Sequence, residues 1–369
     1  MISVVHAFSR RNSGDSLLVD LTLQRLKGAG IAQADLQVLA LDPHSFDDLD
    51  RVVEVPGEPW GRPSIAAGKA TGHLLASSLS LATGMRLRLG TVARTLATSD
   101  GIVAVGGGYL RTPGVVPSLG VALNHAAQLG VASRGTAPSI YLPQSIGPLR
   151  GPIGATVMRR LSGITAIHVR DDRSAAELHH LDNVRRTPDL AVLELAEQYP
   201  VPLKTVGAPP ILVARALPHA AGYHDRLRTL ARALPGHQWA VQADGLGGRS
   251  DEAFYQRLGA TSSGSLRQAL ADDPAVIVSV RLHGALESLI AGRPAVHLSY
   301  ERKGWGAYED LGLGDFVHSA RHFDPTEVAA QVSRIQADPG AFWEPLQRRL
   351  PHLAERSAAL TEQLRSTFS

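Results

Sequence analysis

Two segments in the second half of the chain place basic and titratable side chains directly after buried strands. The apolar run Ala275–Val280 predicts such a strand and is followed at once by Arg281, Leu282 and His283. A strand, a tight turn and a helix N-terminus bind anions well, because free amides and the helix dipole point at the ligand. Arg281 can clamp a carboxylate or phosphate, and a histidine can donate a proton near neutral pH. The alternative is that Arg281 belongs to a structural ion pair and His283 is a buried, hydrogen-bonded ring.

The next predicted strand, Ala295–Leu298, leads into a loop that contains Tyr300, Glu301 and Lys303. If this strand is a parallel neighbour of the first, its end brings a further cation and a carboxylate to the same edge of the sheet. The alternative is a solvated charged loop.

Polar and glycine residues also follow strands in the first half of the chain. Asn12 and Asp15 follow the strand Ile2–Ala7, and they could hydrogen-bond a sugar hydroxyl, although Asp15 could instead cap a helix. The further candidates are the glycines Gly106, Gly107 and Gly108, then Gln144 in the loop 143–148, and Arg170. The three glycines would let a backbone or substrate approach closely, but they lack the full spacing of a dinucleotide-binding motif.

The elements that must position these residues are short apolar strands alternating with helical segments, which is typical of parallel sheets covered on both faces. We therefore predict an α/β protein of two doubly wound domains, 1–198 and 205–335, facing each other across a ligand cleft at their strand ends. The segment Tyr199-Pro-Val-Pro-Leu203 is the predicted linker. A long C-terminal helix, 342–369, with Pro345 and Pro351 as start or kink signals, is expected to pack back on the first domain.

Composition narrows the classes of protein and of site. The 369 residues are 44% hydrophobic and include no cysteine, which excludes disulfides and cysteine-based zinc or iron–sulfur sites. No stretch reaches the roughly 20 apolar residues of a membrane span. The chain is expected to be cytoplasmic, and to meet any membrane peripherally, at the inner face of the plasma membrane.

The net charge of +3 conceals a basic segment. Residues 59–170 contain eleven Lys or Arg and a single acid, Asp100. The positive potential of a segment with this excess of basic residues attracts and binds anions. Nucleic acid is not the expected partner, because the basic residues are dispersed and aromatic residues make up only 5%. A phosphate-bearing substrate or an anionic membrane surface fits better, and the alternative is a skewed surface charge with no partner.

Together, these motifs resemble the polysaccharide pyruvyl transferase family in order and spacing. The resemblance rests on Asn12-x-Gly14-Asp15, Gly106–Gly108, Pro143-Gln-Ser-Ile-Gly-Pro148, Val169-Arg-Asp-x-x-Ser174, Thr187-Pro-Asp-Leu-Ala191, Arg281-Leu-His283, Gly292-Arg-Pro294 and Ser299-Tyr-Glu-x-Lys303. One departure is Ser9-Arg-Arg11, where the family often has glycines before the Asn. This departure leaves the acceptor's identity open.

The resemblance implies a fold like that of the B-type glycosyltransferases and transfer of a pyruvyl unit from phosphoenolpyruvate to two hydroxyls of one sugar, forming a cyclic ketal. It implies donor binding by Arg170, Arg281, His283 and Lys303. His283 is the expected acid and Asp15, Asp189 or Glu301 the base. Asn12, Asp15, Gly107, Gly108 and Gln144 are the expected acceptor residues. No metal or resident cofactor is expected, since phosphoenolpyruvate is a co-substrate.

The implied acceptor is a sugar of a cell-surface glycan or its lipid-diphosphate-linked precursor. Two alternatives stay open at this stage: a glycosyltransferase of the same architecture that uses a nucleotide sugar, and a non-catalytic carbohydrate- or lipid-binding module. The first would bind a uridine or guanosine diphosphate, and the second would bind sugar without releasing phosphate.

Overall fold

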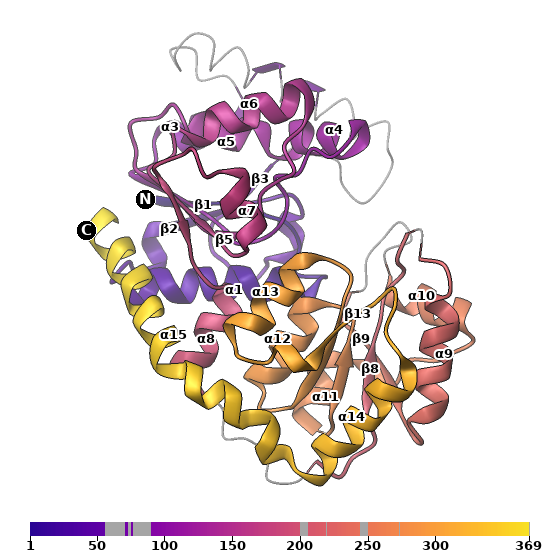
Figure 1. Cartoon of the computed structure of the whole chain (residues 1–369). Helices are drawn as coiled ribbons and strands as arrows, with labels where there is room; N and C mark the ends of the chain where they lie inside the picture. The colour runs from indigo at the N-terminus through magenta and orange to yellow at the C-terminus, as the bar shows by residue number, and fades with distance from the viewer. Residues whose placement is uncertain are drawn as a thin grey trace. The chain divides into compact units, whose positions relative to one another are not determined.

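Parallel strands alternate with helices along the chain (Figure 1). The computed structural model describes residues 1–55, 71–72, 75–76, 90–199, 206–218, 220–243, 250–272 and 274–368. They form two units. Unit 1 contains Met1–Arg10, Leu18–Leu190 and Ala358–Ser369, and unit 2 contains Arg11–Leu17 and Ala191–Ser357.

Unit 1 is built on a seven-stranded sheet in the order β3-β2-β1-β4-β5-β6-β7, in which each neighbouring pair is parallel. The inner strands are hydrophobic and fully buried, which is what a sheet covered on both faces requires. The strands are β1 (Ile2–Ala7), β2 (Leu36–Ala40), β3 (Val52–Glu54), β4 (Gly101–Ala104), β5 (Ser139–Gln144), β6 (Ala166–Val169) and β7 (Val184–Arg186).

The helices of unit 1 connect these strands. They are α1 (Ser13–Gly28), α3 (Thr91–Ala97), α4 (Val115–Asn124), α5 (Ala126–Ala132), α6 (Gly151–Leu161) and α7 (Asp172–Glu177). The sequence predicts one helix over Val116–Gln128, whereas the structure divides it at His125 into α4 and the buried α5, with a bend of 57°.

Unit 2 has a six-stranded sheet in the order β10-β9-β8-β11-β12-β13, again parallel throughout. The prediction of two doubly wound parallel sheets is therefore confirmed. The strands are β8 (Ile211–Val213), β9 (Gln238–Val241), β10 (Gly264–Ser265), β11 (Ile277–Ser279), β12 (Ala295–Ser299) and β13 (Val317–Ser319). The helices are α8 (Leu190–Glu197), α9 (Tyr223–Ala233), α10 (Asp251–Leu258), α11 (Leu266–Asp272), α12 (Leu282–Ile290), α13 (Arg302–Asp310), α14 (Pro325–Ala337) and α15 (Pro339–Phe368).

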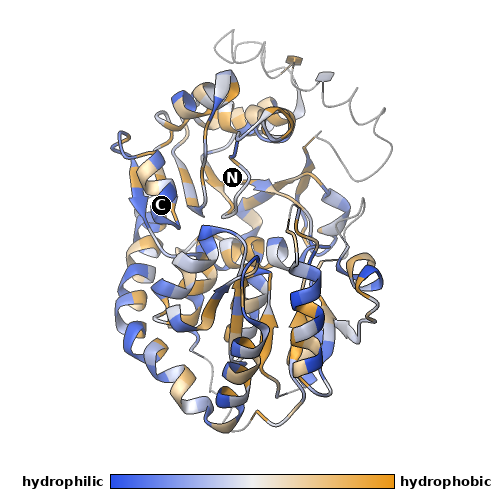
Figure 2. Cartoon of the chain, turned by 45° about the vertical axis from the view of Figure 1, so that its right-hand side comes forward, coloured by the Kyte–Doolittle hydropathy of each residue, from blue (hydrophilic) through white to orange (hydrophobic). Residues whose placement is uncertain are grey.

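The distribution of hydrophobic residues in each helix and strand reflects which side of it is buried. Hydrophobic residues run along the strands, and helix faces turned away from the sheets carry hydrophilic residues (Figure 2). Helix α15 is continuous through Pro345 and Pro351, so these prolines neither start nor divide it. Its buried residues Leu346, Leu353 and Leu360 recur every seventh position, which keeps one face of the helix against the protein.

The division into units differs from the predicted domain limits at three places. Residues 191–198, which the sequence prediction counts in the domain 1–198, belong to unit 2. Residues 11–17, which the sequence prediction counts in the domain 1–198, belong to unit 2, because the N–H of Ser13 bonds to the Gln242 carbonyl oxygen and Asn12 forms a bridge with Ala243. The last residues of α15, from Ala358 on, belong to unit 1, where Arg365 bonds to the Gly28 carbonyl oxygen. The predicted linker lies outside the described residues apart from Tyr199.

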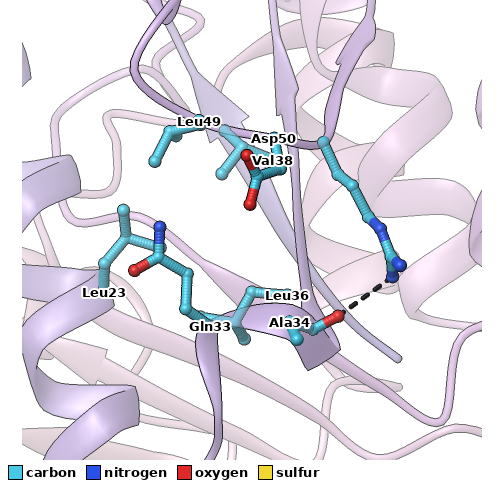
Figure 3. A pocket seen from close by; sticks show the side chains of 8 residues that line it. Leu23, Gln33, Ala34, Leu36, Val38, Leu49 and Asp50 are labelled. Atoms are coloured by element: carbon cyan, nitrogen blue, oxygen red, sulfur yellow. Dashed lines mark hydrogen bonds between the residues drawn. The ribbon is translucent and has the colours of Figure 1, made fainter.

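A small pocket of about 120 Å³ lies in unit 1, near the amino ends of the strands (Figure 3). Leu36 and Val38 of β2, Leu23 of α1 and Asp50 are among the residues that line it. None of the candidate site residues lines this pocket. It lies at the wrong end of the strands for a doubly wound domain, whose ligands bind outside the carboxyl ends.

Candidate functional site

The carboxyl ends of β8 and β11 form the switch point of the unit 2 sheet, where the chain turns toward opposite edges. Ligands of doubly wound sheets bind outside this point. Arg281 and His283 follow β11 directly: Arg281 precedes the first turn of α12 and His283 lies in that turn. The predicted placement of both residues at a strand end is confirmed.

A glycine allows the first turn of α12 to pack closely. A Cβ on Gly284 would lie 2.7 Å from Oε1 of Gln242 and 2.9 Å from Oγ of Ser279, both closer than real side chains approach. The Ser279 hydroxyl also donates to the Arg281 carbonyl oxygen at 2.8 Å and accepts the Arg281 N–H. This network fixes the backbone from which Arg281 and His283 project.

Arg281 forms a two-pronged ion pair with Asp251, a residue that the sequence analysis did not single out. Its Nε donates to both carboxylate oxygens, at 3.1 and 3.0 Å, and its Nη2 donates to Oδ1 at 2.5 Å. Asp251 is 1% exposed and also accepts the backbone N–H groups of Gln242 and Ala243. Arg281 is thus held rigidly, and the bonds to Asp251 engage Nε and Nη2 but not Nη1.

His283 packs against the loop that precedes α1. A Cβ on Gly14 would lie 2.9 Å from both Cβ and Nδ1 of His283, so a larger residue there would displace the imidazole. Asn12 caps this turn, since its Oδ1 accepts the Gly14 N–H at 3.2 Å. The suggestion that Asp15 is the cap is wrong, because Asn12 takes that place and Asp15 lies inside the first turn.

The Asp15 carboxyl is surrounded by groups that could exchange protons or hold an anion. Asn12 donates to its Oδ2 at 2.7 Å. Burial raises the pKa of Asp15 from 3.8, while the nearby charges of His283, Lys303 and Arg281 and the Asn12 hydrogen bond oppose that rise. The structure therefore brings together four residues predicted from widely separated segments: Asp15, Arg281, His283 and Lys303. These four, with Asn12 and Asp251, are called the unit 2 cluster below.

Two glutamates border the unit 2 cluster in different ways. Glu301 forms an ion pair of 3.1 Å with Lys303, and both side chains are partly exposed. Glu287 lies one helical turn beyond His283 on α12 and accepts a hydrogen bond of 3.1 Å from the Ser13 hydroxyl. Burial raises the pKa of Glu287 above its ordinary 4.5, although the Ser13 hydrogen bond and the charges of Arg267 and His283 lower it in part. Sequence analysis missed Glu287.

Unit 1 places its own predicted residues at the carboxyl ends of β4, β5 and β6. The Ser145 N–H bonds to the Gly107 carbonyl oxygen at 2.8 Å, and the Arg170 N–H bonds to the Gln144 carbonyl oxygen at 3.0 Å. A Cβ on Gly108 would lie 3.8 Å from Nη2 of Arg170. Gly107, Gly108, Gln144 and Arg170 are therefore neighbours, although they come from three separate loops.

Arg170 and Asp189 form a buried ion pair in unit 1. Arg170 is 3% exposed and Asp189 1%, and Nη1 lies 2.5 Å from Oδ2. The charge of the Asp189 carboxylate is already paired with a guanidinium, which counts against Asp189 as the general base. Beside the pair, the buried amide of Gln144 makes no hydrogen bond of normal geometry within the described chain, so it retains its capacity to bind a ligand. The assignments of Arg170 to the donor and Gln144 to the acceptor stay predictions.

A buried group of histidines and tyrosines at the end of β1 was also missed. His6 has a φ of 67° and its ring nitrogens contact Nδ1 of His125, at 3.1 Å, and the Tyr141 hydroxyl, at 3.0 Å. Burial lowers the pKa of His125 to about 3, and burial together with His125 lowers that of His6, so both rings are neutral near pH 7. The signal in the sequence is a histidine within an apolar strand.

The residues missed in unit 2 had weaker signals. Glu287 is an acid on a helix whose residues are mostly apolar, which indicates a partly buried carboxyl. Asp251 is the first of two acids, with Glu252, that follow Ser250 at a helix start, and nothing in the sequence pairs it with Arg281 thirty residues later. Within the described ranges, no group of three or more histidine, aspartate or glutamate side chains is placed to hold a metal ion.

Comparison with known families gives one match, over most of the chain. Residues 12–302 match the family model described as polysaccharide pyruvyl transferase. The match begins at Asn12, after β1, and includes Asp15, the strands from β2 to β12 and the first turn of α12 with His283. Among curated proteins, none matches the chain by sequence.

Solved structures resemble the whole chain at low sequence identity. UDP-GlcNAc 2-epimerase from Methanocaldococcus jannaschii matches with a TM-score of 0.53 at 10% identity, covering 98% of this chain and 100% of that one. The Anabaena protein Alr3699/HepE, solved with UDP-glucose, gives a TM-score of 0.54 at 11% identity, covering 99% and 98%. A trehalose-6-phosphate synthase gives 0.53 at 12% identity, covering 98% of each chain. Such similarity shows the fold alone, and the predicted likeness to the B-type glycosyltransferases is confirmed.

Proposed function

Because the chain belongs to the polysaccharide pyruvyl transferase family, we propose that it transfers a pyruvyl group from phosphoenolpyruvate to two hydroxyls of one sugar. The products are a cyclic ketal and inorganic phosphate. The observation that carries the proposal is the unit 2 cluster, where an imidazole, a carboxyl of raised pKa and two cations lie together and of which all residues but Lys303 fall within the matched region. The reaction needs all three kinds of group.

The donor is held by Arg281 and Lys303. Phosphoenolpyruvate carries a phosphate and a carboxylate on a small frame, so its binding requires cations in fixed positions. Asp251 orients Arg281 through its bonds to Nε and Nη2. The N–H groups of Nη1 are then the ones that a ligand would use. Lys303 supplies a point charge that can follow the phosphate as it leaves.

His283 protonates C3 of phosphoenolpyruvate. This step converts the methylene to a methyl group and leaves C2 electron-deficient, like an oxocarbenium ion. One sugar hydroxyl attacks C2, the C2–O bond to phosphate breaks, and the second hydroxyl closes the ring. Of the two hydroxyl protons, one balances the proton gained at C3 and the other leaves with phosphate. General acid catalysis of this kind contributes about 10²–10⁴-fold.

Asp15 is the base that takes the hydroxyl proton. Its carboxyl lies beside His283, so it can act on a hydroxyl that attacks the carbon next to the protonated one. Burial makes the ionised form of Asp15 a stronger base than an exposed aspartate. Glu301 is a weaker candidate, because its carboxylate is paired with Lys303. The scheme uses no resident metal or cofactor.

The sugar is part of a cell-surface glycan or of its lipid-diphosphate-linked precursor. Asn12 would contact the attacking hydroxyl of this sugar, since its amide lies beside Asp15. In unit 1, the backbone at Gly107 and Gly108 and the buried amide of Gln144 offer further donors and acceptors for sugar hydroxyls.

The test is to incubate the protein with phosphoenolpyruvate and a panel of short oligosaccharides. We expect one sugar to gain the mass of one pyruvyl unit, with release of one phosphate for each ketal formed. A thermal-shift comparison of phosphoenolpyruvate with uridine and guanosine diphosphates runs in parallel. Stabilisation by a nucleoside diphosphate alone, with sugar transfer from its nucleotide sugar, would show that the protein is a glycosyltransferase instead.

A further inference from the structure

Helix α4 of unit 1 exposes an apolar face in the described part of the chain. Val115, Val116 and Leu119 are 77%, 79% and 51% exposed. The sequence of α4, VVPSLGVALN, contains no charged residue, and its opposite face packs into unit 1 through Ser118 and Val121. An apolar patch of this kind on a protein surface marks a contact with another apolar phase.

One exposed arginine, Arg150, and one partly exposed arginine, Arg111, lie near the base of this helix. Arg111 lies four residues before Val115, and Arg150 lies beside it because the Arg150 N–H bonds to the Thr112 hydroxyl at 2.7 Å. Helix α6, which packs on α4 (Figure 1), begins after Arg150 and carries Arg159 and Arg160 in its last turn. The described residues 90–170 include one acid, Asp100, and this is paired with the N-terminal ammonium at 2.5 Å.

The arginines at the far end of α6 are close enough to repel one another. Partial burial, followed by the like charges of Arg134 and Arg159, lowers the pKa of Arg160. The carboxylate of Glu177 lies near the start of α6, where its Oε1 accepts a hydrogen bond from the Leu149 N–H. Arg150 and Arg159 are exposed, and exposed arginines gain stability when they meet an anionic surface.

We propose that the exposed face of α4 inserts into the interface of an anionic bilayer while the surrounding arginines bind its headgroups. The apolar side chains supply affinity that does not depend on charge, and the arginines select anionic lipid. The contact is interfacial. No single helix in the described ranges is long and apolar enough to cross a membrane, and of the bent pair α4 and α5, which passes by length and composition, α5 is buried within unit 1.

This surface goes beyond the proposed reaction and can be tested without it. It would bring the enzyme to the interface at which the diphosphate of a lipid-linked sugar lies. A soluble oligosaccharide would not need it. Binding and turnover on soluble sugar are therefore separate measurements, and either can fail alone.

The experiment measures sedimentation of the full chain with vesicles of phosphatidylcholine, with and without phosphatidylglycerol, at low and high salt. The double variant Val116→Ser/Leu119→Ser should bind anionic vesicles at least about tenfold more weakly at every salt concentration. Arg150→Gln should bind about fivefold more weakly at low salt only. The controls Trp305→Ser and Arg232→Gln, an exposed aromatic and an exposed arginine of unit 2, should bind like the wild type.

Three results would overturn the proposal. Wild-type protein that does not sediment with anionic vesicles has no such surface. A double variant that binds normally but has lost thermal stability would mean that another segment of the chain covers α4. A double variant that binds normally but no longer self-associates would make this face a contact between copies. With the proposal correct, the double variant stays as active as the wild type on a soluble sugar.

Discussion

At the scale of single residues, the two arginines predicted to bind the donor are held in the same way. Arg281 and Arg170 each follow a strand, and each is paired with an aspartate, Asp251 or Asp189. Such pairs hold a guanidinium in one orientation, but they also offset its charge. The alternative that Arg281 belongs to an ion pair is therefore true, and it is compatible with anion binding, because Asp251 engages only Nε and Nη2.

The Arg281–Asp251 pair should behave as one energetic unit. Asp251→Asn and Arg281→Gln should each destabilise the protein, by about 3 kcal/mol, since each leaves a buried partner unsatisfied. The double variant should be more stable than the sum of the two losses predicts, by about 1–3 kcal/mol. Urea unfolding of the four proteins measures this coupling.

The exposed pair Arg228–Asp225, with side chains 41% and 82% exposed, provides the matched control. Its coupling should be close to zero. Additive losses at Arg281 and Asp251 would mean that the bonds between them contribute no more than surface contacts.

At the scale of elements, helix α12 carries two titratable side chains of unit 2. His283 lies in its first turn and Glu287 one turn later, on a helix whose other side chains are largely buried and apolar. The sequence predicts this helix, over Ala285–Ala291, and the strand before it. The structure starts the helix three residues earlier, at Leu282, so that His283 is inside the helix rather than in a turn before it.

Replacement of Glu287 should change how stability depends on pH. Burial raises the pKa of Glu287 in the folded protein, so its protonated form stabilises the fold fully below pH 4.5, and this contribution is lost as the pH rises through the folded pKa. The Glu287→Gln variant has no titratable side chain at this position. Relative to the wild type, it should gain stability as the pH increases above 4.5, by ~1.4 kcal/mol for each unit of raised pKa.

Thermal unfolding at several pH values between 4 and 8 tests this expectation. Glu355→Gln, which replaces an exposed glutamate of α15, should show no such dependence relative to the wild type. A stability difference at Glu287 that is constant with pH, or that decreases as the pH rises, would show that its pKa is not raised by folding.

Apolar patterns in the sequence predict the ends of some strands and helices and not of others. Strands β1, β6 and β8 begin and end where the apolar runs do, because a buried parallel strand is a continuous apolar segment. The edge strand β7, Val-Arg-Arg, is half-buried and polar, so no apolar run marks it. The bend at His125 was also missed, since hydropathy alone does not separate the exposed α4 from the buried α5.

At the scale of the whole molecule, two sheets with the same winding are joined in one chain, and most candidate residues lie at strand ends. Residues 11–17 precede the strand β2 of unit 1 in sequence but belong to unit 2, where Asp15 meets His283. Strand-end reasoning found both residues. It could not place them together, because that depends on hydrogen bonds from Ser13 and Asn12 to the end of β9.

The most direct test of the account is the reaction of phosphoenolpyruvate with an accepting oligosaccharide in D₂O, followed by mass spectrometry of the sugar product. The wild type and the control His322→Ala, which removes an exposed histidine of unit 2, should add one pyruvyl unit whose methyl group carries one solvent deuterium. Folded His283→Ala should form no ketal. A product without deuterium in its methyl group, or full turnover by His283→Ala, would contradict protonation of C3 by His283.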